Sequence, residues 1–113
     1  MGWLVTDETR VLASAEIAES RSQRRTGLLG RDQLDGALVL RPCRWIHTIK
    51  MRFAIDVAYL DADSTVIKID RIVPNRLPLP VRRSVAVIEA QAGAFARWGL
   101  KIGDVVEIRD DNS

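Results

Sequence analysis

The stretch AIDVAYLDADSTVIKIDRIV, residues 54–73, decides the fold of this chain. Two segments rich in aliphatic residues, 54–60 and 66–73, lie on either side of the polar sequence DADS at 61–64. Apolar segments of this length favour strands, and a cluster of Asp and Ser between them is typical of a turn. The stretch therefore predicts an antiparallel hairpin.

The second segment of this hairpin alternates between apolar and charged residues. Ile67, Ile69 and Val73 occupy odd positions, whereas Lys68 and Asp70 occupy even positions. Because successive side chains of a strand point to opposite faces, the three aliphatic side chains are expected on one face. That face is expected to pack on a core, and the charged face to meet solvent.

A second hairpin and a short helix are predicted on the N-terminal side. Segments 3–5 and 11–17 flank a polar turn, and apolar residues recur at every second position from 11 to 17. Ser20 and Gln23 have the spacing of a capping box, in which the two side chains bond to backbone N–H groups. We expect a helix from about residue 21 to residue 26, with Gly27 ending it.

The middle of the chain adds a strand and a long loop. The dipeptide Asp35-Gly36 is a turn signal, and the apolar run 37–40 that follows it ends at Pro42. Three prolines fall within residues 74–80. Proline has no N–H group to donate to a neighbouring strand, so an extended surface loop is expected there.

The C-terminal segments complete a fold in which strands dominate. Strands are expected at 85–90 and 104–109, and a helical turn at 93–98. No series of long helices is present to support a parallel, doubly wound sheet. We therefore expect an α+β, mostly β fold: a compact antiparallel sheet or small barrel with one or two short helices, forming a single domain over residues 1–113.

Cysteine content and hydropathy bear on the compartment. The chain has one cysteine, so it can form no intramolecular disulfide, and small secreted domains usually depend on several. The N-terminal residues lack a basic segment followed by an apolar one, and no run of about 18 apolar residues occurs. We expect a soluble, cytoplasmic monomer that is not attached to a membrane.

The basic residues are concentrated in three stretches. Fourteen of the seventeen are arginine, and twelve lie in segments that contain no acidic residue, 20–31, 36–55 and 71–88. If the fold brings two of these segments together, the surface gains a positive region suited to an anion, a phosphate or a nucleic acid. The alternative is a solvated basic surface with no specific partner.

The stretch CRWIHTIKM, residues 43–51, carries the only cysteine and the only histidine of the chain. Cys43, His47 and Met51 are four residues apart, which aligns them on one face of a helix or a strand, and such soft ligands suit Cu(I). In a strand, however, residues four apart are separated by about 13 Å. That distance prevents a shared metal and prevents His47 from activating Cys43 as a nucleophile, so no metal and no cofactor is expected.

His47 is nevertheless the best place to expect a pocket. Trp45, Lys50 and Arg52 are its sequence neighbours and offer stacking, hydrogen bonding and positive charge. The alternative is a partly buried histidine whose ring bonds to a backbone carbonyl or a carboxylate.

Two carboxylates, Asp56 and Glu89, stand within runs that should be buried on at least one face. A buried carboxylate needs a cationic or N–H partner, or it keeps its proton and its pKa rises. Each is therefore either a structural group paired with an arginine or backbone N–H groups, or part of a site.

The order and spacing of several motifs resemble the bacterial and archaeal family catalogued as domain of unknown function 192. The resemblance extends from about Ala15 to Ile108 and rests on RTGLLGR at 25–31, DGAL at 35–38, HTIKMRFAID at 47–56, VIE at 87–89 with Gly93, and 99–105. The chain departs from the family pattern at HTIKM and at Ala54, and Cys43 is not part of that pattern. The resemblance implies a compact, β-rich domain with no established activity.

These observations lead to three functional hypotheses. The first is a non-enzymatic binding module for a small anionic ligand or a peptide, with a site formed by Trp45, His47, Arg52, Asp56 and Glu89. The second is a small hydrolase-like enzyme in which His47 works with Asp56 or Glu89 as acid and base. The third is a nucleic-acid-binding domain that uses the arginine-rich stretches.

Overall fold

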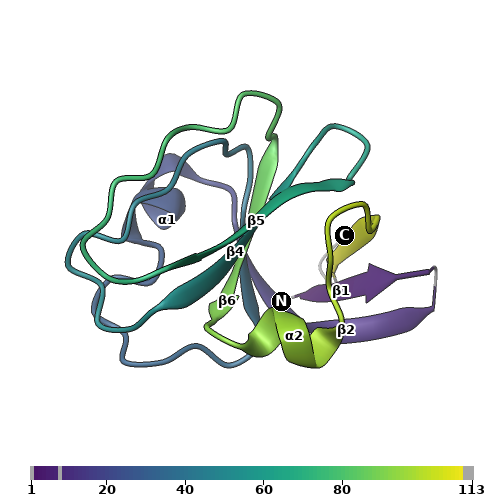
Figure 1. The fold of residues 1–113 in the computed structure, drawn as a ribbon, viewed down its shortest axis with the longest axis horizontal. Coiled ribbons are helices and arrows are strands. Elements are labelled where there is room, and N and C mark those ends of the chain that lie inside the picture. Colours follow the sequence, from purple (N-terminus) through teal and green to yellow (C-terminus); the bar gives the residue numbers. More distant parts are fainter. Residues whose placement is uncertain (1, 8, 111–113) are drawn as a thin grey trace.

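The computed structural model describes residues 2–7 and 9–110. Within these residues the chain forms strands and two short helices (Figure 1). In chain order they are β1 (Gly2–Thr6), β2 (Arg10–Ala18), α1 (Arg21–Thr26), β3 (Ala37–Leu40), β4 (Ile55–Leu60), β5 (Val66–Ile72), β6 (Ala86–Gln91), α2 (Ala94–Trp98) and β7 (Val106–Asp110).

The strands form one mixed sheet in the order β5-β4-β6-β3-β2-β1-β7. Neighbouring strands are antiparallel except β2 and β3, which run parallel with Ile17 opposite Val39. These two strands are joined through α1 and a loop, a long enough connection to return the chain in the same direction. The expectation of a compact, mostly β fold with two short helices is confirmed, but the sheet is not purely antiparallel.

The sheet curls without closing into a barrel. Its edge strands are β5 and β7, and the residues just before them, Thr65 and Val105, form an isolated bridge. Beside this bridge, the Val66 N–H donates to the Asp104 carbonyl at 2.8 Å, and the Val106 N–H donates to the Ser64 carbonyl at 2.9 Å. The two edge strands are otherwise unpaired with each other in the part of the chain that the structure describes.

The hairpin predicted from residues 54–73 is formed by β4 and β5, but the facing of its side chains was predicted wrongly. Tyr59 lies opposite Lys68 and Leu60 lies opposite Val66, so Ile67 is an extra residue that shifts the register. A bulge of this kind interrupts the alternation of faces. Ile67 and Ile69 consequently pack on opposite sides of the sheet, and Val73 lies beyond the strand and is exposed.

The N-terminal hairpin and the helix agree with the prediction. Strands β1 and β2 pair, and α1 spans Arg21–Thr26. Its capping box is complete: the Ser20 hydroxyl accepts from the Gln23 N–H at 3.0 Å, and the Gln23 side-chain oxygen accepts from the Ser20 N–H at 3.1 Å. Neither helix of the described segments is long and apolar enough to cross a membrane.

Gly36 permits the parallel pairing of β2 and β3. Its φ is +74°, and a Cβ at this position would lie 2.6 Å from the Ser14 carbonyl oxygen. Only glycine allows the turn into β3 to approach β2 this closely, and the register that follows places Ala37 opposite Ala15.

Two apolar clusters pack on the two faces of the sheet. Figure 1 shows β1, β7 and α2 on one side of β4, β5 and β6, and α1 with the long loops on the other. The first cluster contains Leu4, Val39, Ala58, Ile88, Phe95 and Val106 among others. The second contains Leu28, Leu38, Ile46, Met51, Val57 and Val87 among others, so loops rather than a second sheet cover that face.

Candidate functional site

The stretch CRWIHTIKM lies in a loop, residues 41–54, that connects β3 to β4 and is called the site loop below. It is neither helix nor strand. The regular spacing of Cys43, His47 and Met51 therefore does not place them on one face of an element, which corrects the geometry expected from the sequence. Among the described residues no group of three His, Cys, Asp or Glu side chains is placed to hold a metal ion.

Thr48 fixes the site loop to the loop 73–85, called the proline loop below. Its hydroxyl donates to the Val73 carbonyl at 2.7 Å and accepts from the Arg76 N–H at 2.9 Å. Its backbone N–H donates to the Arg76 carbonyl, and its carbonyl accepts from the Asn75 N–H at 2.7 Å. Thr48 is fully buried, so these bonds satisfy groups that water cannot reach.

The two loops are also joined further along. The Cys43 N–H donates to the Val85 carbonyl, and the Val81 N–H donates to the Arg44 carbonyl at 2.8 Å. The Ser84 hydroxyl lies 2.9 Å from the Cys43 carbonyl, to which it donates. The irregular backbone of the site loop is therefore bonded to the proline loop near its start and in its middle.

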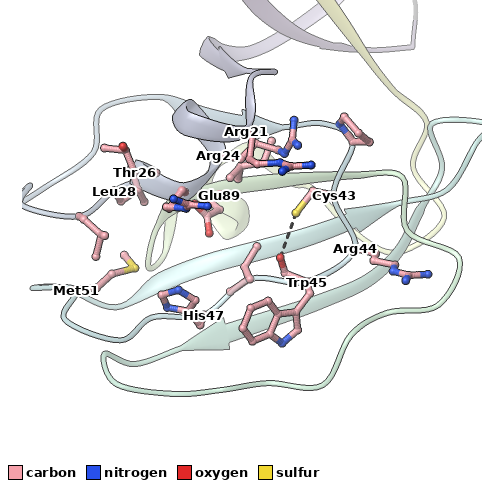
Figure 2. Close-up of a pocket in the computed structure, with 16 residues that line it drawn as sticks. Arg21, Arg24, Thr26, Leu28, Cys43, Arg44, Trp45, His47, Met51 and Glu89 are labelled. Atoms are coloured by element: carbon pink, nitrogen blue, oxygen red, sulfur yellow. Dashed lines mark hydrogen bonds between the residues drawn. The ribbon is translucent and has the colours of Figure 1, made fainter.

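A cavity of about 450 Å³ lies between α1, the site loop and the sheet (Figure 2). Its wall combines apolar and charged side chains. They come from α1 and the three residues after it, from the site loop, and from one residue each of β3 and β6. The lining residues are Arg21, Arg24, Arg25, Thr26, Gly27, Leu28, Leu29, Leu40, Pro42, Cys43, Arg44, Trp45, Ile46, His47, Met51 and Glu89.

Arginines supply most of the charge of this cavity. Four line it, against the single carboxylate of Glu89, within the described segments. Arg24 donates to the carbonyls of Glu19 and Arg41. The guanidinium groups of the other three arginines, at positions 21, 25 and 44, have no hydrogen-bond or ion-pair partner among residues 2–7 and 9–110. The cavity thus joins a positive rim to an apolar interior.

Glu89 lies at the sheet side of the cavity, in β6, which has a strand on either side. It pairs with Leu38 of β3 and Val57 of β4, so its side chain points to the second apolar cluster. The residue is 4% exposed, and its carboxylate has no hydrogen-bond or ion-pair partner in the described part of the chain. Burial without a partner raises the pKa of Glu89 from 4.5 to about 7.

Cys43 and His47 line the same cavity, but neither is placed as a catalytic group. The Cys43 thiol donates to the Trp45 carbonyl at 3.2 Å, and burial raises the pKa of Cys43, which disfavours the thiolate. His47 accepts a hydrogen bond from the Ile49 N–H at Nδ1, so Nε2 carries the hydrogen. Within the residues described, no carboxylate contacts His47.

Trp45 forms one wall beside His47. The centroids of the two rings are 5.5 Å apart, with their planes at 52°. The indole N–H donates to the Pro78 carbonyl at 2.7 Å, which fixes the ring although 41% of the residue is exposed. A fixed aromatic ring beside an imidazole offers a planar surface to a ligand.

Asp56 does not lie with these residues. It is opposite Ala90 in the β4–β6 register, one position from Glu89, so its side chain points to the other face of the sheet. Its carboxylate accepts from Arg71 Nε at 3.0 Å and from the N–H groups of Gly93 and Phe95 at 3.0 and 3.2 Å. Asp56 therefore caps the start of α2, which has no capping side chain of its own.

Arg52 is also outside the cavity. Its guanidinium forms an exposed ion pair with Asp32 at 3.0 Å, and it is not among the lining residues. Of the five residues expected at the site, the structure brings together Trp45, His47 and Glu89 and leaves Arg52 and Asp56 elsewhere.

The sequence marked the arginines of α1 and Arg44 as parts of two acid-free stretches that could form a positive region together, but it did not place them beside His47 and Glu89, and it missed the anchoring role of Thr48. The composition of α1 also set this helix apart, because it carries three arginines, and none of its residues is buried in the structure. A surface helix usually packs on the protein through an apolar face, and α1 has none. No comparable signal identified Thr48, because the two partners of its hydroxyl lie 25 and 28 positions away.

The fold is that of a small β-rich protein with one curled mixed sheet, and its cavity lies under an irregular loop. The chain belongs to the family of domain of unknown function 192, whose model, described as "Uncharacterized ACR", matches residues 4–108. The family expected from the sequence motifs is thus confirmed.

The chain is also similar to three individual proteins, one known by its sequence and two by their structures. A UPF0127 protein of Pyrococcus abyssi is 27% identical over 95% of this chain and 97% of its own length. A crystal structure of a protein of unknown function from Novosphingobium aromaticivorans shares 25% identity, with a TM-score of 0.81 over 95% of this chain and 84% of that one. A protein of Sinorhizobium meliloti, described as a candidate transcription regulator, shares 26% identity, with a TM-score of 0.79 over 95% and 91% of the two chains.

Proposed function

We propose that this protein binds a small organic anion in the cavity between α1 and the site loop, without converting it chemically. The observation that carries the proposal is the set of unpaired guanidinium groups on the rim of an apolar cavity. Five of the ten arginines that do not line the cavity form ion pairs with carboxylates, as in the Arg31–Glu16 and Arg71–Asp56 pairs. Unpaired arginines beside a cavity favour a phosphate or carboxylate ligand.

The shape and lining of the cavity support a small ligand with an apolar body. A volume of about 450 Å³ falls within the range of small-molecule sites. Leu28, Ile46 and Met51 are buried apolar residues of its wall, and Trp45 offers a ring to one side. An anion with a hydrocarbon or planar body would match both the rim and the interior.

The proposal is tested by titrating the protein with hexyl phosphate and with hexyltrimethylammonium in a calorimeter at fixed ionic strength. The two probes have the same chain and opposite charge. Hexyl phosphate is expected to bind and the ammonium probe to show no binding. Equal binding of both would indicate apolar partitioning alone, and no binding of the phosphate would refute the proposal.

A pair of double variants locates the interaction. Arg25→Gln with Arg44→Gln removes two charges from the rim, whereas Arg82→Gln with Arg83→Gln removes two charges from exposed positions of the proline loop outside the cavity. Two lost guanidinium contacts are expected to weaken hexyl phosphate about tenfold, with little change in the control. An equal loss in both would indicate a diffuse basic surface and favour the nucleic-acid hypothesis.

A further inference from the structure

The Glu89 carboxylate is the polar group of the cavity that the arginine rim does not explain. A site for anions alone would place no carboxylate in its wall, because like charges repel. Figure 2 shows Glu89 among the lining residues, with Thr26 and Leu28 on one side and Cys43 on the other. It lies in an interior strand of the sheet, between Leu38 of β3 and Val57 of β4.

A buried, unpaired carboxylate at this position lowers the stability of the fold unless a ligand pairs with it. A buried carboxylate without a partner destabilises the fold, and an apolar residue would fit among the aliphatic side chains around it. Asp56 shows the alternative: equally buried at 4% exposure, it is bonded to an arginine and two backbone N–H groups. Of these two buried carboxylates, Glu89 is the unpaired one, and it faces the cavity.

We infer that Glu89 recognises a hydroxyl group of the ligand, at the end remote from the anionic group held by the arginines. The inference rests on the proposed function, because it assumes that the cavity holds an anion. The ligand class is then a hydroxylated organic phosphate or carboxylate with an apolar segment between its two polar ends.

A hydroxyl is the group that suits Glu89 best. Burial raises the pKa of Glu89 to about 7, so the protonated and ionised forms are both populated near neutral pH. A hydroxyl donates to the ionised carboxylate and accepts from the protonated one. An ammonium group would bond well only to the ionised form, and a second carboxylate only to the protonated form.

The recognition of a hydroxyl would make Glu89 a specificity-determining residue. A site whose buried polar group expects a partner discriminates against a ligand that lacks it, since the group is then left unpaired. A ligand with an apolar end would leave the Glu89 carboxylate without a hydrogen bond, whereas a ligand with a hydroxyl end would form one with it.

The test measures the binding of hexyl phosphate and 6-hydroxyhexyl phosphate to wild type, Glu89→Gln and Glu89→Leu. Butyl with 4-hydroxybutyl phosphate, and octyl with 8-hydroxyoctyl phosphate, cover other distances between the two ends of the ligand. Wild type is expected to bind the best hydroxylated probe about tenfold more tightly than the plain probe of the same length. Glu89→Leu is expected to lose or reverse this preference. Glu89→Gln, which keeps an acceptor and a donor, is expected to retain part of it.

The outcomes separate this inference from the proposed function. If wild type binds plain and hydroxylated probes equally at every length, the hydroxyl inference is overturned while anion binding stands. A preference that persists in Glu89→Leu would also overturn it. If none of the phosphates binds wild type, the proposed function fails and the inference fails with it. Glu107→Leu, at an exposed position of β7, is the control for loss of a carboxylate.

Discussion

Replacement of Glu89 by glutamine should change how the stability of the protein depends on pH. Glu89 has a pKa of about 7 in the folded protein, against the ordinary value of 4.5. The folded state therefore holds this proton more tightly than the unfolded state does. Between pH 4.5 and about 7 the folded state binds more protons, so its stability falls as pH rises through this range.

The magnitude follows from the same two values. The difference between 4.5 and about 7, at about 1.4 kcal/mol for each pKa unit, corresponds to about 3 kcal/mol of stability lost above pH 7. Glutamine has nearly the same shape and does not titrate. The free energy of unfolding of Glu89→Gln minus that of wild type should therefore rise by about 3 kcal/mol between pH 4.5 and pH 8.

The two side chains that interact electrostatically with Glu89 keep their protons throughout this range. Cys43 and Tyr59 are its electrostatic neighbours, and burial raises the pKa of both, that of Tyr59 to about 12. The assay is urea unfolding followed by circular dichroism at several pH values, with Glu107→Gln as the control for loss of an exposed carboxylate. A difference between Glu89→Gln and wild type that stays constant from pH 4.5 to 8 would refute the account of Glu89 as buried and unpaired.

Three further substitutions test the structural account, each by urea unfolding. Thr48→Val leaves the bonded groups of the proline loop without partners and should cost about 2–3 kcal/mol; a cost below 0.5 kcal/mol would contradict the anchoring role. Asp56→Ala should cost about 2–4 kcal/mol, because the Gly93 and Phe95 N–H groups at the start of α2 lose their acceptor, and a loss below 1 kcal/mol would count against this reading. Gly36→Ala should cost about 2 kcal/mol or more because its Cβ meets backbone, whereas Gly30→Ala, with open space around it, should cost about 1 kcal/mol; equal losses would show that the close approach to β2 is unimportant.

Local signals were sufficient for several elements of the fold. The capping box at Ser20 and Gln23 predicted where α1 begins and Gly27 predicted where it ends, because the bonds that define both ends lie within a few residues. The hairpin of β4 and β5 was likewise visible as two apolar segments around a turn. The bulge at Ile67 was not, since it depends on which residues of the partner strand it faces.

The candidate site could not be predicted without knowing how the strands pair. The sequence marked Asp56 and Glu89 as buried carboxylates, and both are. Whether they share a face depends on the β4–β6 register, which places Asp56 opposite Ala90 rather than Glu89 and so sends the two side chains to opposite sides. The cavity itself joins α1, the site loop and β6, segments whose contact no local pattern could reveal.

The most direct test of the central claim is a ¹H–¹⁵N correlation spectrum of the protein titrated with 6-hydroxyhexyl phosphate. If the cavity is the binding site, shifts that saturate with added probe should be concentrated in residues 21–29, the site loop and the amides around Glu89. They should be weak in residues 93–100 around α2, on the other face of the sheet. Saturating shifts centred on α2, or no saturating shifts at all, would contradict the claim.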